Sequence, residues 1–283
     1  MRVVVVHNAQ SGSALPIADI RAKCEAAGIE VTDAVAVGSD LERDLHPHLA
    51  DGRTILAIGG DGTVSAVAGL VAHTDATLVP IPGGTLNNFT KDLGVPQDID
   101  EALARAASTS ARQVDIASVN DVYFVNNSSI GLYSTTLRER QSLESLHGKW
   151  SSAAIATVKA FWRFKSYRVE AEGMEFTTPI IFVGNNRYPV DGFDGGFRRE
   201  RLDEGTLSMF VVAGKRRWSM FKLGLHLVFV RSLKHASDFE DHYGTEFTIE
   251  TKRTFVSVSH DGELTSLATP LRYRIHPGVL RVI

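Results

Sequence analysis

The chain has 283 residues, of which 43% are hydrophobic and 22% are charged, so it can form one large or two medium-sized domains with buried cores. Its formal net charge of -3 argues against a global basic surface of the kind that gathers nucleic acid. Cys24 is the single cysteine, which excludes an internal disulfide and a cysteine-based zinc site and favours a reducing, cytoplasmic setting.

The amino-terminal run MRVVVV is too short for the apolar core of a signal peptide, and we interpret it as a first strand. No segment reaches the roughly 20 apolar residues that a membrane-spanning helix needs. The nearest such segment, residues 221–230, contains Lys222 and His226. We therefore expect any membrane contact to be peripheral, at the inner face.

The first 115 residues alternate short β-branched runs with longer, Ala-rich stretches. Continuous apolarity in the runs suits strands that are covered on both faces. This pattern predicts an α/β domain over 1–115 with a parallel sheet. Strands are expected over 2–6, 31–37, 54–58 and 77–81, and helices over 14–27, 41–49, 64–73 and 99–107.

After Asp115 the sequence changes to short alternating strands with polar turns. The pair Asn120-Asp121 lies between two apolar runs and resembles a tight hairpin turn. Residues 149–164 and 217–233 are predicted helices. We therefore expect an antiparallel β domain over 116–283, joined to the first domain by a short hinge near Asp115.

A glycine-rich loop, Gly59 to Thr63 (GGDGT), follows one predicted strand and opens a predicted helix. Glycines at a strand end let the backbone approach a polyphosphate, and the first amides of a helix present donors at the positive end of its dipole. Asp61 would repel phosphate unless it binds a metal or takes a proton, so either use is chemical. The alternative is an ordinary glycine turn in which Asp61 is the helix N-cap.

A second glycine loop, residues 82–89 (PGGTLNNF), follows the next predicted strand. Ligands bind outside the carboxyl ends of strands in open α/β sheets, so two such loops on adjacent strands predict one site. A third candidate is the end of the first strand, where Asn8, Ser11 and Gly12 can turn the chain and donate to phosphate. Taken alone, that stretch reads as an ordinary turn.

The two loops in this order and spacing resemble the diacylglycerol kinase catalytic domain, which bacterial lipid kinases, sphingosine kinases and ceramide kinases share. Three later segments are similar, in order, to the family's domain-crossing, acidic and closing D-G-E elements: residues 114–131, 201–212 and 259–283. The resemblance implies a Rossmann-like nucleotide domain followed by a C-terminal antiparallel β-sandwich. It also implies that ATP binds in the cleft between them.

The resemblance further implies roles for individual residues. Glu263 takes the position of the proton acceptor, while Asp61 and Asp115 surround the catalytic magnesium, and these three are the catalytic candidates. Phosphoryl transfer needs both a metal that offsets phosphate charge and a carboxylate near the attacking hydroxyl. Without the resemblance, Glu263 reads as part of an exposed hairpin turn.

The remaining site candidates are implied in the same way. A structural magnesium in the acidic segment would use the Glu204 carboxylate with backbone carbonyls of Arg201 and Thr206. The metal candidates are therefore Asp61, Asp115, Arg201, Glu204 and Thr206. The nucleotide candidates are Asn8, Ser11, Gly12, Gly59, Gly60, Asp61, Gly62, Thr63, Val64, Ser65, Gly84, Thr85 and Asn87.

Four positions depart from the family pattern. Relatives often have proline where Ala9 stands, a basic residue at Ser13, and aspartate at Asn88 and at Glu204. The first two departures remove a phosphate contact that Lys91, after the second loop, is placed to replace; a solvated surface lysine is the alternative.

The acceptor-binding surface has two candidates, both basic and aromatic: residues 149–165 and the run that begins at Lys215, Arg216 and Arg217. Either could rest on an anionic membrane surface, or both could pack on the β domain with solvated basic faces.

The expected function is ATP- and Mg²⁺-dependent phosphorylation of a lipid alcohol, with diacylglycerol as the model acceptor. A homodimer is left open, and nucleic acid is not an expected partner. One rival is a kinase of a soluble substrate related to NAD kinases, which also carry a GGDGT loop. The other is a catalytically silent lipid-binding module, against which the retention of Asp61, Asp115 and Glu263 argues.

Overall fold

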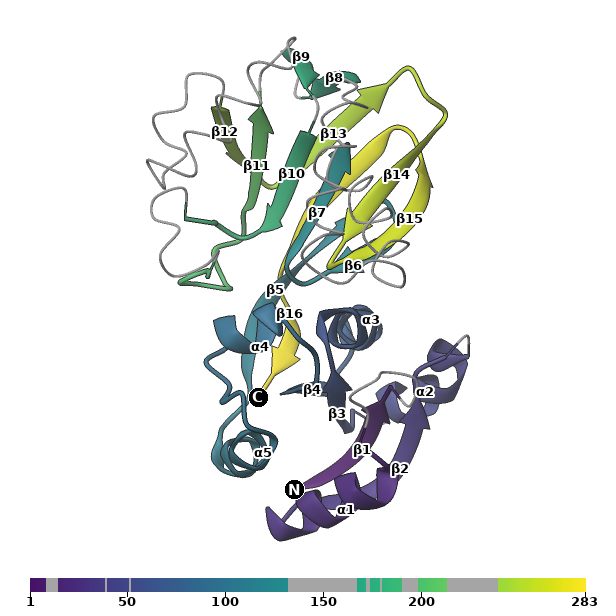
Figure 1. Ribbon diagram of the computed structural model, residues 1–283, viewed down its shortest axis with the longest axis vertical. Helices are drawn as coiled ribbons and strands as arrows, with labels where there is room; N and C mark the ends of the chain where they lie inside the picture. The colour runs from purple at the N-terminus through teal and green to yellow at the C-terminus, as the bar shows by residue number, and fades with distance from the viewer. Residues whose placement is uncertain are drawn as a thin grey trace, which may run out of the picture.

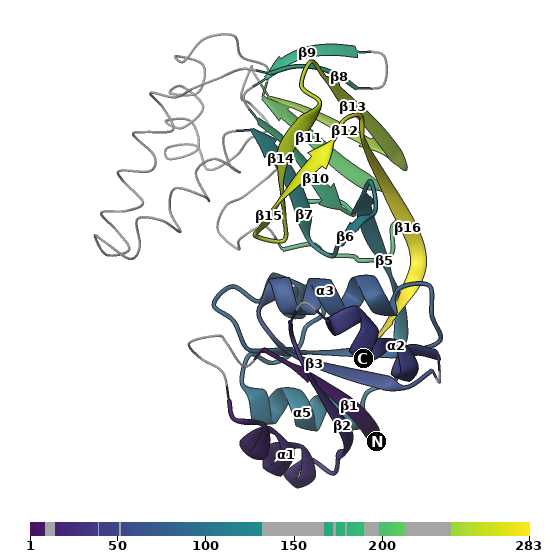
Figure 2. The same cartoon turned by 90° about the vertical axis from the view of Figure 1, so that its right-hand side faces the viewer.

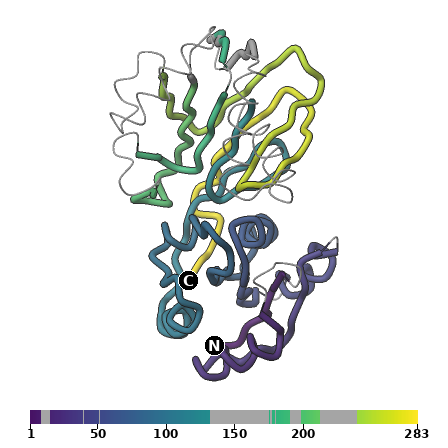
Figure 3. Tube along the Cα trace, in the orientation of Figure 1, coloured from purple at the N-terminus to yellow at the C-terminus, as the bar shows by residue number. Residues whose placement is uncertain are grey.

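The computed structural model describes residues 1–8, 15–38, 40–50, 52–131, 167–171, 174–178, 180–189, 198–212 and 239–283. In Figure 1 an α/β domain lies below a β domain. Both ends of the chain lie in the lower part (Figure 3). The predicted helices over 149–164 and 217–233, and both basic candidates for the membrane surface, fall outside the described residues.

The α/β domain contains a parallel sheet in the order β2-β1-β3-β4. Its strands are β1 (Arg2–His7), β2 (Glu30–Ala36), β3 (Thr54–Gly59) and β4 (Thr77–Pro82). Its helices are α1 (Ile17–Ala26), α2 (Leu41–Ala50), α3 (Asp61–Val71), α4 (Asn88–Asp92) and α5 (Ile99–Ser108). The predicted parallel sheet is confirmed.

Helices cover both faces of this sheet, which explains the continuous apolarity of its central strands. Figure 2 shows α2 and α3 on the face toward the β domain, and α1 and α5 on the opposite face. Val3 to Val6 in β1 and Ile55 to Ala57 in β3 are almost completely buried. This placement brings the first turn of α3 directly beneath the β domain.

The second part is a sandwich of antiparallel strands, as predicted. One sheet has the order β12-β11-β10-β7-β14-β15, and the facing one contains β5, β6, β8, β9, β13 and β16. The first sheet is built from β7 (Asn127–Gly131), β10 (Ile180–Asn185), β11 (Leu207–Val212), β12 (Phe239–Gly244), β14 (Phe255–His260) and β15 (Glu263–Ala268). The second is built from β5 (Arg112–Val119), β6 (Val122–Phe124), β8 (Tyr167–Ala171), β9 (Met174–Thr178), β13 (Glu246–Thr251) and β16 (Leu271–Val282).

Side chains from both sheets form one apolar core that includes Phe124, Ile181, Leu207 and Tyr273. The expected hairpin at Asn120-Asp121 is also present. Asn120 has φ 52°, a left-handed conformation that asparagine tolerates, and Val119 pairs with Val122 across the turn.

Two strands, β5 and β16, connect the domains. They pair with each other along most of their length and run from the α/β domain into the sandwich (Figure 1). At the end of β16, Val282 pairs with Leu78 of β4, and the Ile283 N–H donates to the Leu78 carbonyl at 3.0 Å. One sheet therefore continues from the first domain into the second. Among the described residues, no helix combines the length and the apolar character needed to cross a membrane.

Candidate active site

The two glycine loops lie against each other, backbone to backbone, at the carboxyl ends of β3 and β4. The Gly83 N–H donates to the Gly59 carbonyl at 2.9 Å. A Cβ atom added to Gly84 would lie 2.5 Å from the Cα of Gly60, and one on Gly83 would lie 3.0 Å from the Cα of Gly59. Only glycine permits this approach, so the loops form one continuous backbone surface beside the start of α3.

Asp61 is the first residue of α3. The residue in the N-cap position is Gly60, with no side-chain capping bond, so the alternative in which Asp61 is the N-cap is wrong. Asp61 Oδ1 instead accepts hydrogen bonds at 3.2 Å from the Phe89 N–H, in α4, and from the Asn126 side-chain amide. The second carboxylate oxygen, Oδ2, makes no hydrogen bond within the described ranges. It is the atom available to a metal ion or to solvent.

Glu263 reaches the same place from the other domain. It is the first residue of β15, and it follows a two-residue turn at Asp261 and Gly262, whose φ angles are 45° and 88°. A Cβ atom added to Gly62 would lie 2.7 Å from Glu263 Oε1. The carboxylate therefore rests on the first turn of α3. Glu263 is exposed at a hairpin turn, as the alternative interpretation expects, and its role as proton acceptor stays a prediction.

A cavity of about 540 Å³ opens beside this contact. One wall is α3, with Gly62, Ala66 and Leu70, and the facing wall is formed by the β5–β6 turn and the turn before Glu263. The cavity adjoins both Glu263 and the glycine loop. An acceptor molecule could therefore enter between the two domains.

Asp261, which is not among the predicted site residues, joins the domains at the base of this turn. Its buried carboxylate accepts four hydrogen bonds: from Ser65 Oγ in α3 at 2.6 Å, and from the N–H groups of Val125, Asn126 and Asn127 at 2.7, 2.8 and 3.0 Å. Burial raises the pKa of this carboxyl above its ordinary value, while the hydrogen bonds from Ser65 and the backbone oppose that increase. The sequence signal that could have identified Asp261 is its place as the aspartate of the D-G-E element.

Three predicted nucleotide residues in α3 are buried by packing: Thr63, Val64 and Ser65. Thr63 lies against Gly59, where an added Cβ would be 2.6 Å from the Thr63 Cβ, and the Ser65 hydroxyl is directed to Asp261. Asn8 directly follows β1, at the same edge of the sheet as the glycine loops. Ser11 and Gly12 lie outside the described residues.

The second loop is held in shape by its own side chains. Asn87, with φ 51°, accepts from the Gly84 N–H and donates to the Gly84 carbonyl, both at 2.9 Å. Lys91 Nζ donates to the Leu86 carbonyl, so this lysine closes the loop. Gly84, Thr85 and Leu86 remain exposed. The loop thus presents its backbone rather than the Asn87 amide.

Asp115 lies in a different cluster. Its side chain is 2% exposed, and its two oxygens accept the N–H groups of Gly205 at 2.7 Å and Gly278 at 2.8 Å, while its own N–H donates to the Leu202 carbonyl. We call Asp115, Leu202, Gly205 and Gly278 the Asp115 cluster. Within the described ranges no hydrogen bond or ion pair links it to Asp61.

The acidic segment, residues 201–212, contributes Leu202 and Gly205 to the Asp115 cluster. Glu204 Oε2 accepts from the Arg187 N–H at 3.0 Å, and the Thr206 carbonyl accepts from the Asn186 N–H at 2.9 Å. Arg201 pairs with Asp203 at 3.0 Å, which lowers the pKa of the Asp203 carboxyl. The part of the chain that the structure describes contains no group of three or more His, Cys, Asp or Glu side chains that could hold a metal ion.

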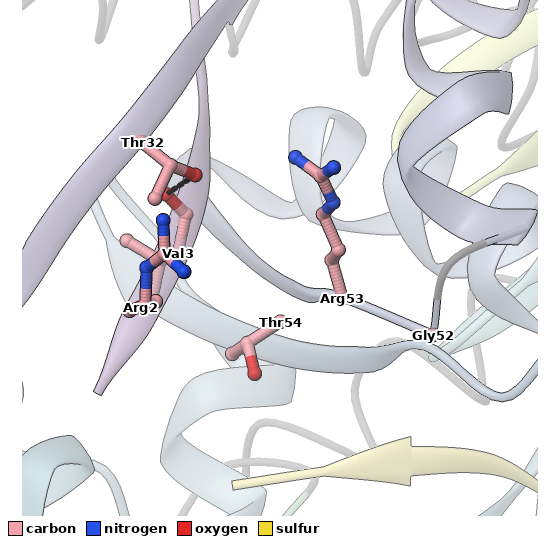
Figure 4. A pocket seen from close by; sticks show the side chains of 6 residues that line it. All are labelled: Arg2, Val3, Thr32, Gly52, Arg53 and Thr54. Carbon is pink, nitrogen blue, oxygen red and sulfur yellow. Dashed lines mark hydrogen bonds between the residues drawn. The ribbon is translucent and has the colours of Figure 1, made fainter.

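A second cavity, of about 350 Å³, lies at the opposite edge of the parallel sheet (Figure 4). Arg2, Thr32 and Thr54 line it near the amino-terminal ends of their strands, and the Thr32 hydroxyl donates to the Val3 carbonyl at 3.0 Å. Open α/β sheets bind ligands at the other edge, where the glycine loops lie. The cleft beside α3 is therefore the candidate active site.

Comparisons with known proteins show similarity to diacylglycerol kinases and lipid kinases. Residues 2–119 match the family model of the diacylglycerol kinase catalytic domain. A Staphylococcus aureus diacylglycerol kinase is 28% identical over 229 residues, covering 75% of this chain and 70% of the relative. A Chromohalobacter salexigens protein named probable lipid kinase YegS-like is 25% identical over 234 residues, covering 80% and 74%.

Solved structures share the fold over the whole chain. A crystal structure of a diacylglycerol kinase from Bacillus anthracis is similar with a TM-score of 0.69 at 22% identity, covering 100% of this chain and 96% of that one. Another crystal structure from Bacillus anthracis gives a TM-score of 0.73 at 25% identity, covering 100% and 97%. The two-domain arrangement of this chain is therefore one that has been seen by experiment.

Proposed function

We propose that the protein transfers the γ-phosphate of ATP to the hydroxyl group of a lipid alcohol, with a diacylglycerol-like acceptor, because residues 2–119 match the family model of the diacylglycerol kinase catalytic domain and the similar proteins are named as lipid kinases. One observation carries the proposal beyond this similarity. The Glu263 carboxylate of the second domain lies on Gly62, in the first turn of the helix that the glycine loop opens.

The loop surface suits polyphosphate. The amino-terminal end of α3, an 11-residue helix, lies beside the paired glycine backbones, and no side chain stands between the two loops. Helix N-termini and exposed backbone amides favour phosphate because they present N–H donors at the positive end of the dipole. These elements would hold the β- and γ-phosphates of ATP.

Glu263 is the proposed base of the transfer. As the acceptor oxygen attacks the γ-phosphorus, its O–H proton passes to the Glu263 carboxylate, the new O–P bond forms, and the bond between the γ-phosphorus and the β–γ bridging oxygen breaks. ADP leaves with that oxygen. A carboxylate can take the proton because the hydroxyl becomes more acidic as it bonds to phosphorus.

Asp61 is the proposed ligand of a magnesium ion. Magnesium is usually bound by one or two carboxylates together with substrate phosphates, and Asp61 has one oxygen fixed by two hydrogen bonds and the other without a described partner. When bound, the ion would offset negative charge on the phosphates. Asp115 was also predicted to lie near this ion, and its buried hydrogen bonds make that role the weaker part of the proposal.

The experiment combines a substrate screen with one variant. Purified protein is incubated with labelled ATP, magnesium and a panel of lipid alcohols in mixed micelles, alongside NAD and a water-soluble diol. Transfer to a lipid supports the proposal, and transfer only to a soluble acceptor favours the alternative related to NAD kinases. No transfer to any acceptor, with ATP still bound, favours a silent module.

Glu263→Gln then tests the assigned base, because glutamine keeps the shape and loses the basicity. The single-turnover rate should fall by about 100-fold or more, with ATP affinity and the melting temperature nearly unchanged. Glu246→Gln makes the same chemical change at a partly exposed carboxylate that pairs with Arg274 at 3.1 Å, and it serves as the control. A Glu263→Gln variant with the wild-type rate would refute the role of Glu263.

A further inference from the structure

A buried line of hydrogen bonds crosses the domain interface and ends on Asp61. Asp92 Oδ2 in α4 accepts from Arg199 Nε at 2.8 Å, and Arg199 Nη2 donates to Asn126 Oδ1 at 2.9 Å. Asn126 Nδ2 then donates to Asp61 Oδ1 at 3.2 Å. Asp61 and Asp92 belong to the first domain. Asn126 follows β6 and Arg199 follows β10, and both strands belong to the second domain.

The chemistry of the two neighbours fixes the orientation of the Asn126 amide. A guanidinium group has only donors, so the oxygen of the amide must face Arg199, and the NH₂ group must then face Asp61. A rotated amide would place NH₂ against the guanidinium and an oxygen against the carboxylate. The orientation of the Asn126 amide is therefore fixed from both sides, by the donors of Arg199 and by the acceptor of Asp61.

Arg199 itself has little freedom. Its side chain is 0% exposed, and that of Asp92 is 3% exposed. Nη1 donates to the Val125 carbonyl at 2.7 Å and to the Asn185 carbonyl at 2.9 Å, and the guanidinium carbon lies 5.3 Å from the centre of the Tyr188 ring. Each of the three guanidinium nitrogens has a partner, so the group is held in one position and one plane.

We propose that Asn126 is a positioning residue for Asp61 and that the buried Asp92–Arg199 pair holds the Asn126 amide in the orientation this requires. An apolar pair of similar size is often as stabilising as a buried ion pair, or more so. The presence of the buried Asp92–Arg199 pair is therefore better explained by the geometry that it imposes on Asn126 than by a gain in stability. The inference rests on the proposed function only for the role given to Asp61.

The consequence for Asp61 is directional. Donors from Asn126 and from the Phe89 N–H both reach Oδ1, so Oδ2 is left turned away from the interface contacts. The Phe89 donor belongs to the first domain and the Asn126 donor to the second, so Asp61 has both of its donors only when the two domains are together.

Asn126→Asp is the sharpest variant because it changes one group only. The new carboxylate still accepts from Arg199 and its backbone N–H still reaches Asp261, but an oxygen replaces the donor that faces Asp61. We expect the turnover number to fall by about 10- to 100-fold, a typical effect of losing a group that orients a ligand residue. The KM for ATP should change by less than about threefold. The melting temperature should fall, because the new carboxylate lies against that of Asp61, so the turnover number is compared at a temperature at which both proteins are folded. An unchanged turnover number would overturn the proposal.

A second pair of variants separates positioning from stability. Arg199→Met alone leaves the buried Asp92 without its ion-pair partner and should destabilise the fold strongly. The double variant Asp92→Leu/Arg199→Met should recover stability without recovering the turnover number, because the oxygen of the Asn126 amide then has no partner and the amide is held on the Asp61 side alone. Recovery of both would show that the pair is purely structural, and would overturn the proposal. Asp98→Ala, which removes the N-cap bonds of α5 at 2.9 and 3.1 Å, controls for stability loss away from the interface.

A readout that needs no activity keeps this inference distinct from the proposed function. Nitrogen-15 relaxation of the Asn126 side-chain amide should show a rigid group in the wild type and a mobile one in Asp92→Leu/Arg199→Met. An amide that stays equally rigid in the double variant overturns the proposal. If the amide becomes mobile while the wild-type protein phosphorylates no acceptor, the positioning by Arg199 stands and the proposed kinase function fails.

Discussion

Asp61 and Glu263 differ from Asp115 and Asp261 in whether a carboxylate oxygen is left without a described hydrogen-bond donor. Asp61 leaves one oxygen without a described partner, and Glu263 is exposed and rests on a glycine. Asp115 accepts one backbone N–H on each oxygen, and Asp261 accepts four hydrogen bonds. Residues of one chemical type therefore divide into those with capacity left for a ligand and those that join segments of the chain.

The largest expected effect is that of Asp61→Asn. Asparagine keeps the size of the side chain and removes the charge that would act on a metal ion, so turnover should fall by about 100-fold or more, equal to about 2.7 kcal/mol. The free energy of unfolding should change by less than about 1 kcal/mol. A transfer assay and urea unfolding measure the two quantities, with Asp100→Asn, at a surface ion pair with Lys23, as the matched control. Retention of more than a tenth of the turnover contradicts the comparison.

Gly62→Ala, like Asp61→Asn, should lower activity without lowering stability. The added Cβ would meet the Glu263 carboxylate at 2.7 Å, so the flexible Glu263 side chain must move away. We expect turnover to fall by about tenfold or more, while stability stays level or rises by up to about 1 kcal/mol because alanine is the better helix residue. In a Glu263→Gln background the same change should have little further effect on the rate. Additive losses would show that Gly62 acts independently of Glu263.

Asp115→Asn should show the opposite pattern. An amide has one acceptor oxygen, so one of the two N–H groups, of Gly205 or Gly278, would face NH₂. The free energy of unfolding should fall by about 1–3 kcal/mol, with less than a tenfold change in the turnover of the folded protein. Thermal melts and a transfer assay on the same samples decide this. A loss of turnover as large as that of Asp61→Asn, without loss of stability, would instead support the predicted metal role of Asp115.

The smallest expected effect is a pH dependence at His276, two residues before Gly278. Burial, together with the neighbouring His73 and Arg274, lowers the pKa of the His276 imidazole. Because the folded pKa lies below the unfolded value of about 6.5, the unfolded state binds more protons in mild acid. The contribution of His276 to stability is thus present above about pH 6.5 and is lost as the pH falls through the lowered folded pKa. Urea unfolding at pH 8 and pH 5 should show a smaller pH dependence for His276→Gln, and an equal dependence would count against this assignment.

Much of the fold could be predicted because local patterns of apolar and polar residues indicate its strands and helices. The runs of β1, β3 and β4 are almost entirely apolar, since helices cover both faces of the sheet. Each predicted strand of the first domain corresponds to an observed one. Helix α3 begins at Asp61, three residues earlier than predicted, because Asp61-Gly62-Thr63 was taken for loop sequence although it forms the first helical turn.

Only those site residues that lie within a local sequence motif could be predicted. Asp61 and Glu263 each stand in a recognisable loop or turn, and the structure brings the two elements together. Arg199 carries no local signal, because its partner Asp92 lies 107 positions earlier in the chain. The hydrogen bonds of Asp115 likewise come from Gly205 and Gly278, whose approach depends on the folding of both domains.

The pairing of Val282 with Leu78 also bears on how the protein is made. The two residues are 204 positions apart, so the outer edge of β4 is synthesised long before its partner strand. At about 5–20 residues per second, that interval is roughly 10–40 s. Over that time the nascent α/β domain would present an unpaired strand edge, a feature that invites association with other chains. The last residues of β16 would therefore act as a protective strand, and a nascent chain without them would be prone to aggregate before the sandwich is complete.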